Sequence, residues 1–315
     1  MIISVNTYHL IVTNCTARKR GGQASLRWGS EFVGKDLATT VRQWRMALAG
    51  HEPKLLAREM YMGRSMVDAK YVADTLNSPL HIVSAGMGLI AGTDEVAPYD
   101  LTPSGSRGGL QETLSHFEVS STQWWDLLCG GKGLTSLLAR HPESVLLVAL
   151  PANYVEMLAH DLSQLPQDAV RRARFFTSQP GADALPDGLA SMVMPYDNRL
   201  ESVPNYAGTR SDFPQRAMRH FVEFLGAHKL PQDEARAAVN EALAPYQPPC
   251  LIERQRADDA TIKELIRKQW RATGGRGNAL LRYLRDDARI SCEQGRFAQL
   301  WREVSNDLTH LMLGR

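Results

Sequence analysis

The chain has 315 residues, 43% of them hydrophobic and 22% charged, and its formal net charge is +2. This length suits one large domain or two, and no stretch approaches the roughly 18 apolar residues of a membrane-spanning helix. Because the net charge is almost zero, any nucleic-acid binding must come from local basic patches.

The cysteine pattern points to a reducing compartment. Cys15, Cys129, Cys250 and Cys292 are far apart and include no CxxC pair. We therefore expect free thiols in a cytoplasmic protein, without a disulfide framework or a zinc site. The first residues have no basic start and no small-residue cleavage site, so they predict a strand in place of a signal peptide.

Residues 8–13 are apolar and β-branched and predict the first strand. The loop that follows, residues 14–22, combines short hydrogen-bonding side chains, three successive cations and glycines. Such a loop at a strand end can contact phosphate, which makes Thr16, Arg18 and Lys19 candidates. The loop lacks the GxxxxGK[ST] spacing of a nucleoside triphosphate site, and a solvated basic turn is the alternative.

Helices are expected over residues 36–49 and 54–77, and Ser65 could cap the second part of the latter. A second buried strand, 80–83, ends in small residues that include Ser84 and Gly86. These would allow a ligand to approach the backbone closely.

An acidic loop braced by two prolines follows this strand. It carries four side chains able to bind or catalyse: Asp94, Glu95, Tyr99 and Asp100. An open α/β sheet places its ligand at such a strand end, although an ordinary βα connection is the alternative. The next segment, 104–109, is rich in glycine and hydroxyls, and its Arg107 could hold a phosphodiester.

Further strands and helices alternate along the chain. Ser120 or Ser121 caps a helix whose Trp124 and Trp125 are expected in the core. Strands are predicted over 145–150, 174–177 and 190–194, with a helix over 151–165. This alternation predicts an α/β fold, a mostly parallel sheet with helices on both faces. In the polar loop 205–213, Arg210 could point into the site or pair with Asp212.

The composition changes near residue 213, where only helices are predicted: 214–228, 231–244, 258–273, 277–286 and 293–308. Residues 246–250 read as a linker. We therefore expect an α/β catalytic domain over 1–212 and a helical, basic, nucleic-acid-binding module over 213–315. The candidate DNA-binding cations are Arg267, Lys268, Arg271, Arg276 and Arg282. The alternative is a solvated surface, because acidic residues are interspersed among these cations.

Three blocks within residues 8–103 carry a resemblance: LIVTNCTARKR, AREMYMGRSMVDAKYVAD and IVSAGMGLIAGTDEVAPYDLTP. Together they resemble a bacterial domain-of-unknown-function family that is distantly similar to the uracil-DNA-glycosylase-like α/β fold. Within that fold, the chain looks closest to the Brig type of phage-defence DNA glycosylase. The resemblance implies removal of glucosylated hydroxymethylcytosine from phage DNA, which leaves an abasic site. Asn14 stands where such enzymes place a water-positioning Asp or Asn. Their aspartate-bearing first motif and late histidine motif are not recognisable here, which leaves the leaving-group stabiliser unassigned.

The residues fit this chemistry in outline. Breaking an N-glycosidic bond builds positive charge on the sugar, which a carboxylate can stabilise, and Asp100 is the first candidate, with Asp94 and Glu95 behind it. Asn14 could orient water, and Tyr99 could stack on the extruded base or donate its hydroxyl. Ser84, Arg18, Lys19 and Arg107 are candidates for gripping phosphates.

We therefore expect a monofunctional DNA glycosylase that acts on double-stranded, hypermodified phage DNA in antiviral defence. It would need no cofactor, metal, membrane or obligate protein partner. Two alternatives stay open: a nucleoside or nucleotide N-glycosidase or base-transferase, and a non-catalytic DNA-binding protein.

Overall fold

The fold is taken from a computed structural model that describes residues 8–21, 25–103, 110–250 and 253–313, with the backbone alone for 309–313. The chain divides into two compact units, Met1–Pro249 and Cys250–Arg315. The division falls within the segment predicted as a linker.

A five-stranded sheet forms the centre of the first unit, in the order β5-β4-β1-β8-β9. Its strands are β1 (His9–Asn14), β4 (Leu80–Ser84), β5 (Gly88–Ala91), β8 (Val145–Ala149) and β9 (Ala173–Phe176). All pairings are parallel except that of β4 with β5, which run antiparallel at one edge. Every residue of β1 is buried, as expected for the central strand of a sheet that is covered on both faces. The predicted α/β class and mostly parallel sheet are thus confirmed.

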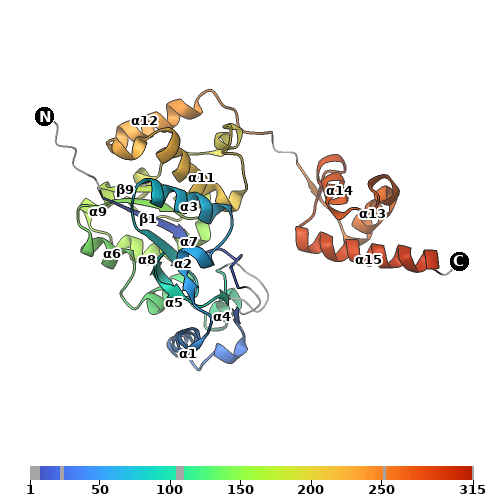
Figure 1. The fold of residues 1–315 in the computed structure, drawn as a ribbon, viewed down its shortest axis with the longest axis horizontal. Coiled ribbons are helices and arrows are strands. Elements are labelled where there is room, and N and C mark those ends of the chain that lie inside the picture. Colours follow the sequence, from blue (N-terminus) through green and yellow to red (C-terminus); the bar gives the residue numbers. More distant parts are fainter. Residues whose placement is uncertain (1–7, 22–24, 104–109, 251–252, 314–315) are drawn as a thin grey trace. The chain divides into compact units, whose positions relative to one another are not determined.

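Helices cover both faces of this sheet (Figure 1). On one face lie α3 (Arg64–Thr75) and α11 (Phe213–Arg219), which pack against each other and against the strands. The other face is covered by helices that include α5 (Ser121–Cys129) and α7 (Ala152–Met157). The remaining helices of the unit are α1 (Leu37–Gly50), α2 (Ala57–Met60), α4 (Leu110–His116), α6 (Leu134–Arg140), α8 (Ala159–Ser163), α9 (Gln167–Arg171), α10 (Gln179–Asp183) and α12 (Gln232–Leu243).

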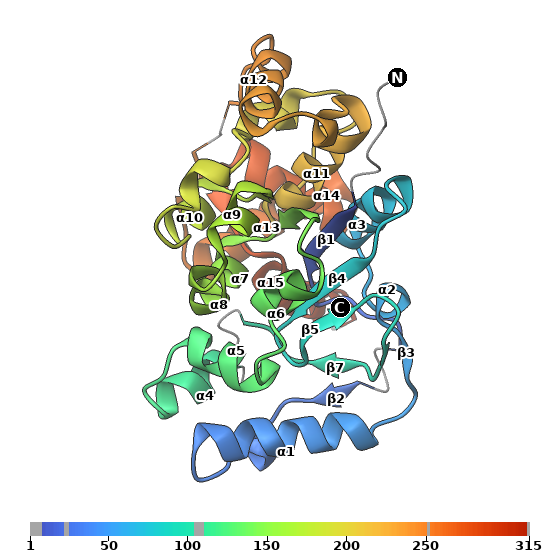
Figure 2. The same ribbon diagram turned by 90° about the vertical axis from the view of Figure 1, so that its left-hand side faces the viewer.

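Two short strand pairs extend the unit beyond the sheet. The parallel pair β2 (Leu26–Arg27) and β7 (Tyr99–Asp100) lies between α1 and the sheet (Figure 2). The antiparallel pair β3 (Leu55–Leu56) and β6 (Glu95–Val96) braces the acidic loop.

Local signals in the sequence account for several helix ends. Ser120 caps α5 through a capping box with Gln123, as predicted, and Trp124 and Trp125 are buried in the core. The interruption expected at residues 61–65 of the helix over 54–77 is present, because Gly63, with a φ of 110°, directly precedes α3. Ser65 therefore lies within α3 and is not its cap. Residues 55–56, at the start of this predicted helix, form β3 instead.

One predicted strand is wrong. Residues 190–194 form the 3₁₀ turn η3 (Ala190–Met192), and only a single bridge links Val193 to Phe175 of β9. The apolar pattern of this segment reflects packing beside the sheet edge, since a short apolar run does not distinguish a strand from a buried turn.

The boundary between the units differs from the one predicted at 212/213. Helix α11 buries Phe213, Gln215, Ala217 and Met218 against the α/β core, so it belongs to the first unit. The composition change near residue 213 marks the end of the strands and not the end of the domain, because the next helix, α11, covers the sheet. The α11 helix continues as the π-turn η6 (His220–Phe224), and the first unit runs on to Pro249.

The second unit has its own small hydrophobic core. Its elements are β10 (Gln255–Arg256), α13 (Asp259–Thr273), α14 (Gly277–Arg282), the π-turn η8 (Tyr283–Asp287), β11 (Ile290–Ser291) and α15 (Gln294–Leu313). The core members are Ile262, Ile266, Leu280, Leu284, Cys292, Phe297, Leu300 and Val304. Asp258 caps α13, and Gly274 and Gly275 with positive φ end it. Over the parts of the chain that the structure describes, no helix of either unit is long and apolar enough to cross a membrane.

Candidate functional site

The candidate site lies at the carboxyl ends of β1, β4 and β8. The chain leaves β1 towards β4 on one side, whereas β8 joins β1 on the other, so the strand order reverses between β1 and β8. Open α/β sheets bind ligands in the crevice at such a switch point. Asn14 ends β1, Ser84 ends β4, and Tyr154 lies in α7 just after β8.

We call the polar group gathered there the carboxyl-end cluster. Its members are Asn14, Cys15, Lys19, Tyr61, Ser84, Tyr99, Tyr154 and Gln215.

Three hydroxyls form a buried network in this cluster. The Oγ of Ser84 lies 2.5 Å from the hydroxyl of Tyr99, and the Tyr61 hydroxyl lies 3.0 Å from that of Tyr99. The Tyr61 hydroxyl also donates to Ser84 Oγ over 3.3 Å. Burial raises the pKa of both tyrosines well above the usual range, so both hydroxyls are neutral. The network is therefore a fixed set of neutral donors and acceptors beneath the strand ends.

A second group surrounds Cys15, the residue that follows β1. Its Sγ lies 3.0 Å from the Tyr154 hydroxyl, which also donates to the Cys15 carbonyl over 3.3 Å. The Asn14 amide donates to the same carbonyl over 2.8 Å. Cys15 is buried, and burial also raises the pKa of Tyr154. These contacts tie the ends of β1 and β8 together across the switch point.

Gln215 of α11 fixes the orientation of Asn14. Its Nε2 lies within hydrogen-bond distance of Asn14 Oδ1 (2.8 Å), Thr13 Oγ1 (3.0 Å) and the Ala149 carbonyl (2.9 Å). Gln215 is fully buried, and its Oε1 has no hydrogen-bond partner within the described ranges. The Asn14 amide thus has a partner at both its oxygen and its nitrogen, and these contacts leave one oxygen lone pair and one N–H that can hold a water molecule.

Lys19 is the cationic member of the carboxyl-end cluster. Its Nζ lies 4.4 Å from the centre of the Tyr99 ring and 5.7 Å from that of Tyr61. Burial lowers the pKa of Lys19, while the neighbouring Cys15 and Asp100 act in the opposite direction. The amine is therefore within electrostatic reach of the Asp100 carboxylate, which is exposed on β7.

Of the predicted catalytic residues, Asn14 and Tyr99 enter the cluster, and Asp100 lies beside it. Tyr99 is only 1% exposed, with its ring packed under Lys19 and edge-on to Trp44. Such a ring offers no face for an extruded base, so stacking on Tyr99 does not fit this structure. Its hydroxyl is likewise occupied by Ser84.

Two predicted ligand contacts serve packing instead. Ser84 has no exposed surface and is already bonded to Tyr99. A Cβ at Gly86 would lie 2.7 Å from the Tyr99 ring, so a small residue is needed there for this ring and not for a ligand. The Gly86 carbonyl accepts the indole N–H of Trp44.

The structure describes the predicted phosphate-binding loop after β1 up to Gly21, and most of those residues are exposed. Thr16 Oγ1 donates to the Arg18 carbonyl over 2.9 Å, which shapes the turn, and the Arg18 side chain is exposed. Arg210 is exposed as well, and Asp212 pairs with Arg216, not with Arg210. Arg107 lies outside the described residues.

The predicted DNA-binding cations of the second unit fall into two groups. Arg267 pairs with Asp307 at 2.7 Å, and Lys268 with Glu264 at 3.5 Å. Arg271, Arg276 and Arg282 have no carboxylate partner within the described part of the unit.

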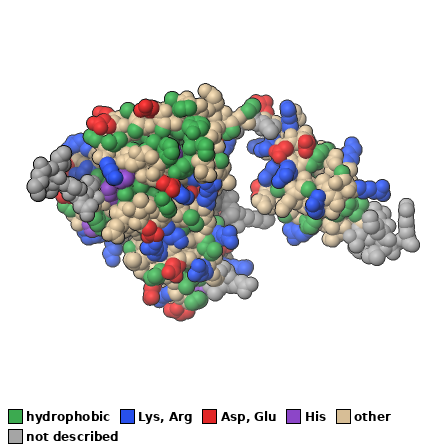
Figure 3. Space-filling model, turned by 45° about the horizontal axis from the view of Figure 1, so that its top comes forward, with side chains coloured by type: hydrophobic (Ala, Val, Ile, Leu, Met, Phe, Trp, Pro, Cys, Tyr) green, Lys and Arg blue, Asp and Glu red, His purple; other side chains and the backbone are tan. Residues whose placement is uncertain are grey.

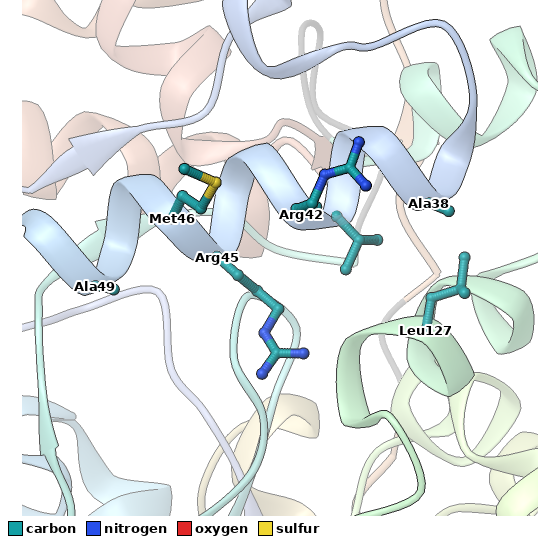
Figure 4. A pocket seen from close by; sticks show the side chains of 7 residues that line it. Ala38, Arg42, Arg45, Met46, Ala49 and Leu127 are labelled. Atoms are coloured by element: carbon teal, nitrogen blue, oxygen red, sulfur yellow. The ribbon is translucent and has the colours of Figure 1, made fainter.

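Arg276 and Arg282 line a hollow of about 790 Å³ together with Phe297 and Trp301. Lys and Arg side chains spread over the surface of this unit, with acidic side chains among them (Figure 3). A second hollow, of about 450 Å³, lies between α1 and α5 and is lined by Arg42, Arg45, Met46 and Leu127 (Figure 4). None of the predicted site residues lines this second hollow.

Four members of the cluster were not among the predicted site residues: Cys15, Tyr61, Tyr154 and Gln215. The first two lie in the family-like blocks, and their position in those blocks was the available signal. Tyr154 follows a predicted strand end, which is a weaker signal. Gln215 had none, because its helix was assigned to the other domain.

No protein-family model, curated protein or solved structure matches this chain. Among the residues that the structure describes, no three His, Cys, Asp or Glu side chains lie close enough together to hold a metal ion. The function must therefore be inferred from the arrangement of the carboxyl-end cluster and its neighbours.

Proposed function

We propose that the protein is a DNA glycosylase that hydrolyses the N-glycosidic bond of a modified base, glucosylated hydroxymethylcytosine in phage DNA, in antiviral defence. The observation that supports this most is the exposed carboxylate of Asp100 within electrostatic reach of the half-buried Lys19 amine. Lys19 lies in the loop after β1, at an end of the sheet where an open α/β fold binds its ligand, and Asp100 lies on the neighbouring strand β7.

Each of the two groups has a role in this reaction. As the bond breaks, the sugar becomes cationic and the departing base becomes anionic. The Asp100 carboxylate stabilises the sugar and accepts a proton from the attacking water. The Lys19 ammonium stabilises the base, which supplies the leaving-group partner that the sequence left unassigned. Asn14, held by Gln215, offers its remaining lone pair to the water molecule.

The second unit supports a DNA substrate over a free nucleoside. Arg271, Arg276 and Arg282 have no carboxylate partner within the described residues and remain available to phosphates. Phosphate contacts supply most non-specific DNA affinity, which offsets the cost of rotating the target base out of the duplex.

The test is to identify bases released from phage DNA that carries glucosylated hydroxymethylcytosine, with unmodified DNA as the comparison. Mass spectrometry should detect the modified base from the first substrate alone. Asp100→Asn should lower the rate of release by about 100-fold or more, because the carboxylate acts in the transition state. Asp187→Asn removes an exposed carboxylate elsewhere in the same unit and should leave the rate unchanged.

Other outcomes point to the alternatives. Turnover of free nucleosides, unaffected by Arg276→Gln with Arg282→Gln, would indicate a nucleoside N-glycosidase or base-transferase. DNA binding without release of any base would indicate a non-catalytic DNA-binding protein.

A further inference from the structure

The backbone holds Lys19 firmly although its loop is otherwise open. Lys19 forms an antiparallel bridge with Tyr61. On either side of the bridge, the Arg20 N–H donates to the Met60 carbonyl over 2.8 Å, and the Met62 N–H donates to the Arg18 carbonyl over 3.0 Å. The Lys19 side chain is thus directed from a fixed point across the Tyr99 ring. A surface cation that merely attracts phosphate does not need such fixing.

The surroundings of the Lys19 amine differ from those of the paired lysines. Lys54, Lys263 and Lys268 each lie within 4 Å of a carboxylate. Lys19 has no such partner among the described residues, and its amine lies over the Tyr99 ring and near the Tyr61 ring. Partial desolvation lowers the pKa of this amine, which increases the fraction present as the free base.

Two residues beside Lys19 in this bridge line an open surface hollow, whereas the Lys19 side chain lies over the Tyr99 ring. Arg20, which follows Lys19, and Tyr61, its bridge partner, both line a hollow of about 350 Å³. Lys19 itself is half-buried, so part of its side chain stays accessible. A fixed, partly desolvated and still accessible amine, within electrostatic reach of the exposed Asp100 carboxylate, is the arrangement that imine chemistry on a sugar aldehyde requires.

We propose that Lys19 is an amine nucleophile that forms an imine with C1′ of an abasic deoxyribose, so that the protein cleaves the DNA strand. The proposal rests on the proposed function only in its choice of substrate, since an abasic site is the product of base removal. It replaces the monofunctional enzyme expected from the sequence with a bifunctional one.

The steps balance without an added reactant. The Lys19 lone pair attacks the C1′ aldehyde carbon, and the resulting carbinolamine takes up a proton from solvent and loses water to form a protonated imine. The later hydrolysis of that imine returns the proton to solvent. The Asp100 carboxylate accepts the C2′ proton, and the electrons of that C–H bond form the C2′–C3′ double bond. The C3′–O bond breaks, and the phosphate leaves with its electron pair. Water then hydrolyses the imine, which releases an unsaturated aldehyde and regenerates the Lys19 amine.

The experiment mixes the full-length protein with synthetic duplex DNA that already contains one abasic site, and adds sodium borohydride. Borohydride reduces the imine to a stable amine, so wild type should give a covalent protein–DNA adduct in denaturing gels. Lys19→Arg keeps the charge but loses the nucleophile, and should lower the adduct by at least about 20-fold. Lys132→Arg, an exposed lysine elsewhere, should leave it unchanged. Asp100→Asn should form the adduct but cleave the strand more slowly.

The outcomes separate this inference from the proposed function. An equal adduct yield from wild type and Lys19→Arg, with equal DNA binding by mobility shift, would overturn the inference. So would base release by a wild-type protein that yields no adduct; the proposed function would then stand. Adduct formation at the abasic site without base release from phage DNA would support Lys19 chemistry and overturn the proposed glycosylase.

Discussion

The two units use arginine in opposite ways. In the α/β unit, Arg216 of α11 is fully buried, with its Nε 2.6 Å from Asp212 and its Nη2 2.6 Å from Glu201. It also donates to the carbonyls of Tyr206 and Thr209. In the second unit, Arg276 and Arg282 have no carboxylate partner within the described residues and line an open hollow. The first arginine holds a fold together, whereas the other two face no carboxylate, and only the Nε of Arg276 is used, in a hydrogen bond to the Thr273 carbonyl.

This difference shows that a basic helical segment can contain arginines with different roles. Both arginine types lie in the segment from residue 213 onward, where composition alone suggested one basic module. Their roles separate only when their burial and partners are known. Variants that replace an arginine with a neutral side chain in each unit therefore test whether the two groups of arginines have different roles.

The largest effect is expected for Arg216→Met. Removing this cation leaves Asp212 and Glu201 without their partner and two carbonyls without a donor. Breaking a buried ion pair in this way costs about 3–5 kcal/mol of the free energy of unfolding. Denaturant unfolding followed by tryptophan fluorescence would measure it.

The matched control is Arg271→Met in the second unit. Arg271 has no carboxylate partner among the described residues, so its loss should change stability by no more than about 0.5 kcal/mol. If both variants lowered stability equally, the contrast between structural and free arginines would fail.

Acid should destabilise the α/β unit before the second unit. Burial lowers the pKa of His220 to about 4, although the Glu223 carboxylate acts in the opposite direction, and the His220 Nδ1 lies 2.8 Å from the Tyr196 hydroxyl. Between pH 6.5 and 4, His220 is protonated in the unfolded chain but stays neutral in the folded chain. The free energy of unfolding therefore falls as the pH falls through this window, by about 3 kcal/mol for this group.

His81 and His228 behave in the same way, since burial lowers the pKa of each to about 4. The second unit contains a single histidine, His310. Urea unfolding at pH 7 and pH 4.5 should show a larger loss for the α/β unit, and His220→Gln should make that loss smaller. An unchanged pH profile in this variant would contradict the assignment.

A smaller effect is expected for Tyr99→Phe. The substitution keeps the ring beneath Lys19 but removes the hydroxyl that bonds Ser84 and Tyr61. A lost hydrogen bond among buried groups costs about 1–2 kcal/mol of the free energy of unfolding. Tyr283→Phe, a half-buried tyrosine of the second unit, should cost less than about 0.5 kcal/mol. Thermal unfolding of both variants would compare them, and equal losses would show that the Tyr99 hydroxyl is not structural.

The sequence predicted the sheet better than the site, and the reason is physical. Continuous apolar runs such as residues 146–149 must be buried between layers, so their strands could be recognised locally. Capping chemistry identified Ser120 in the same local way. The site depends on contacts between distant residues, such as Gln215 with Asn14, which no local pattern encodes.

The same limit explains the three predicted ligand contacts that serve packing instead, Ser84, Gly86 and Tyr99. Tyr99 and Gly86 lie in a loop whose composition suits a ligand, yet they pack against each other. Side-chain type indicates what a residue can bind, whereas burial decides whether a ligand can reach it. Asp100, one residue after Tyr99, is exposed because neighbouring strand residues point to opposite faces.

The smallest energetic change is expected for the paired substitution Arg276→Gln with Arg282→Gln. Neither arginine has a carboxylate partner among the described residues, and the one hydrogen bond of the pair, from Arg276 Nε to the Thr273 carbonyl, is exposed, so the unfolding temperature of the second unit should change little. Loss of two phosphate contacts should weaken DNA binding about fivefold to tenfold near physiological salt, and lower the slope of log affinity against log salt by about 1.8. Fluorescence anisotropy with labelled duplex DNA at several salt concentrations would measure both quantities.

The control is Arg267→Gln with Lys268→Gln, because those cations already face Asp307 and Glu264 and should change the slope less. Equal slopes for the two double variants would mean that pairing with a carboxylate does not decide which cations bind DNA. The contrast between the two units would then rest on the buried Arg216 alone.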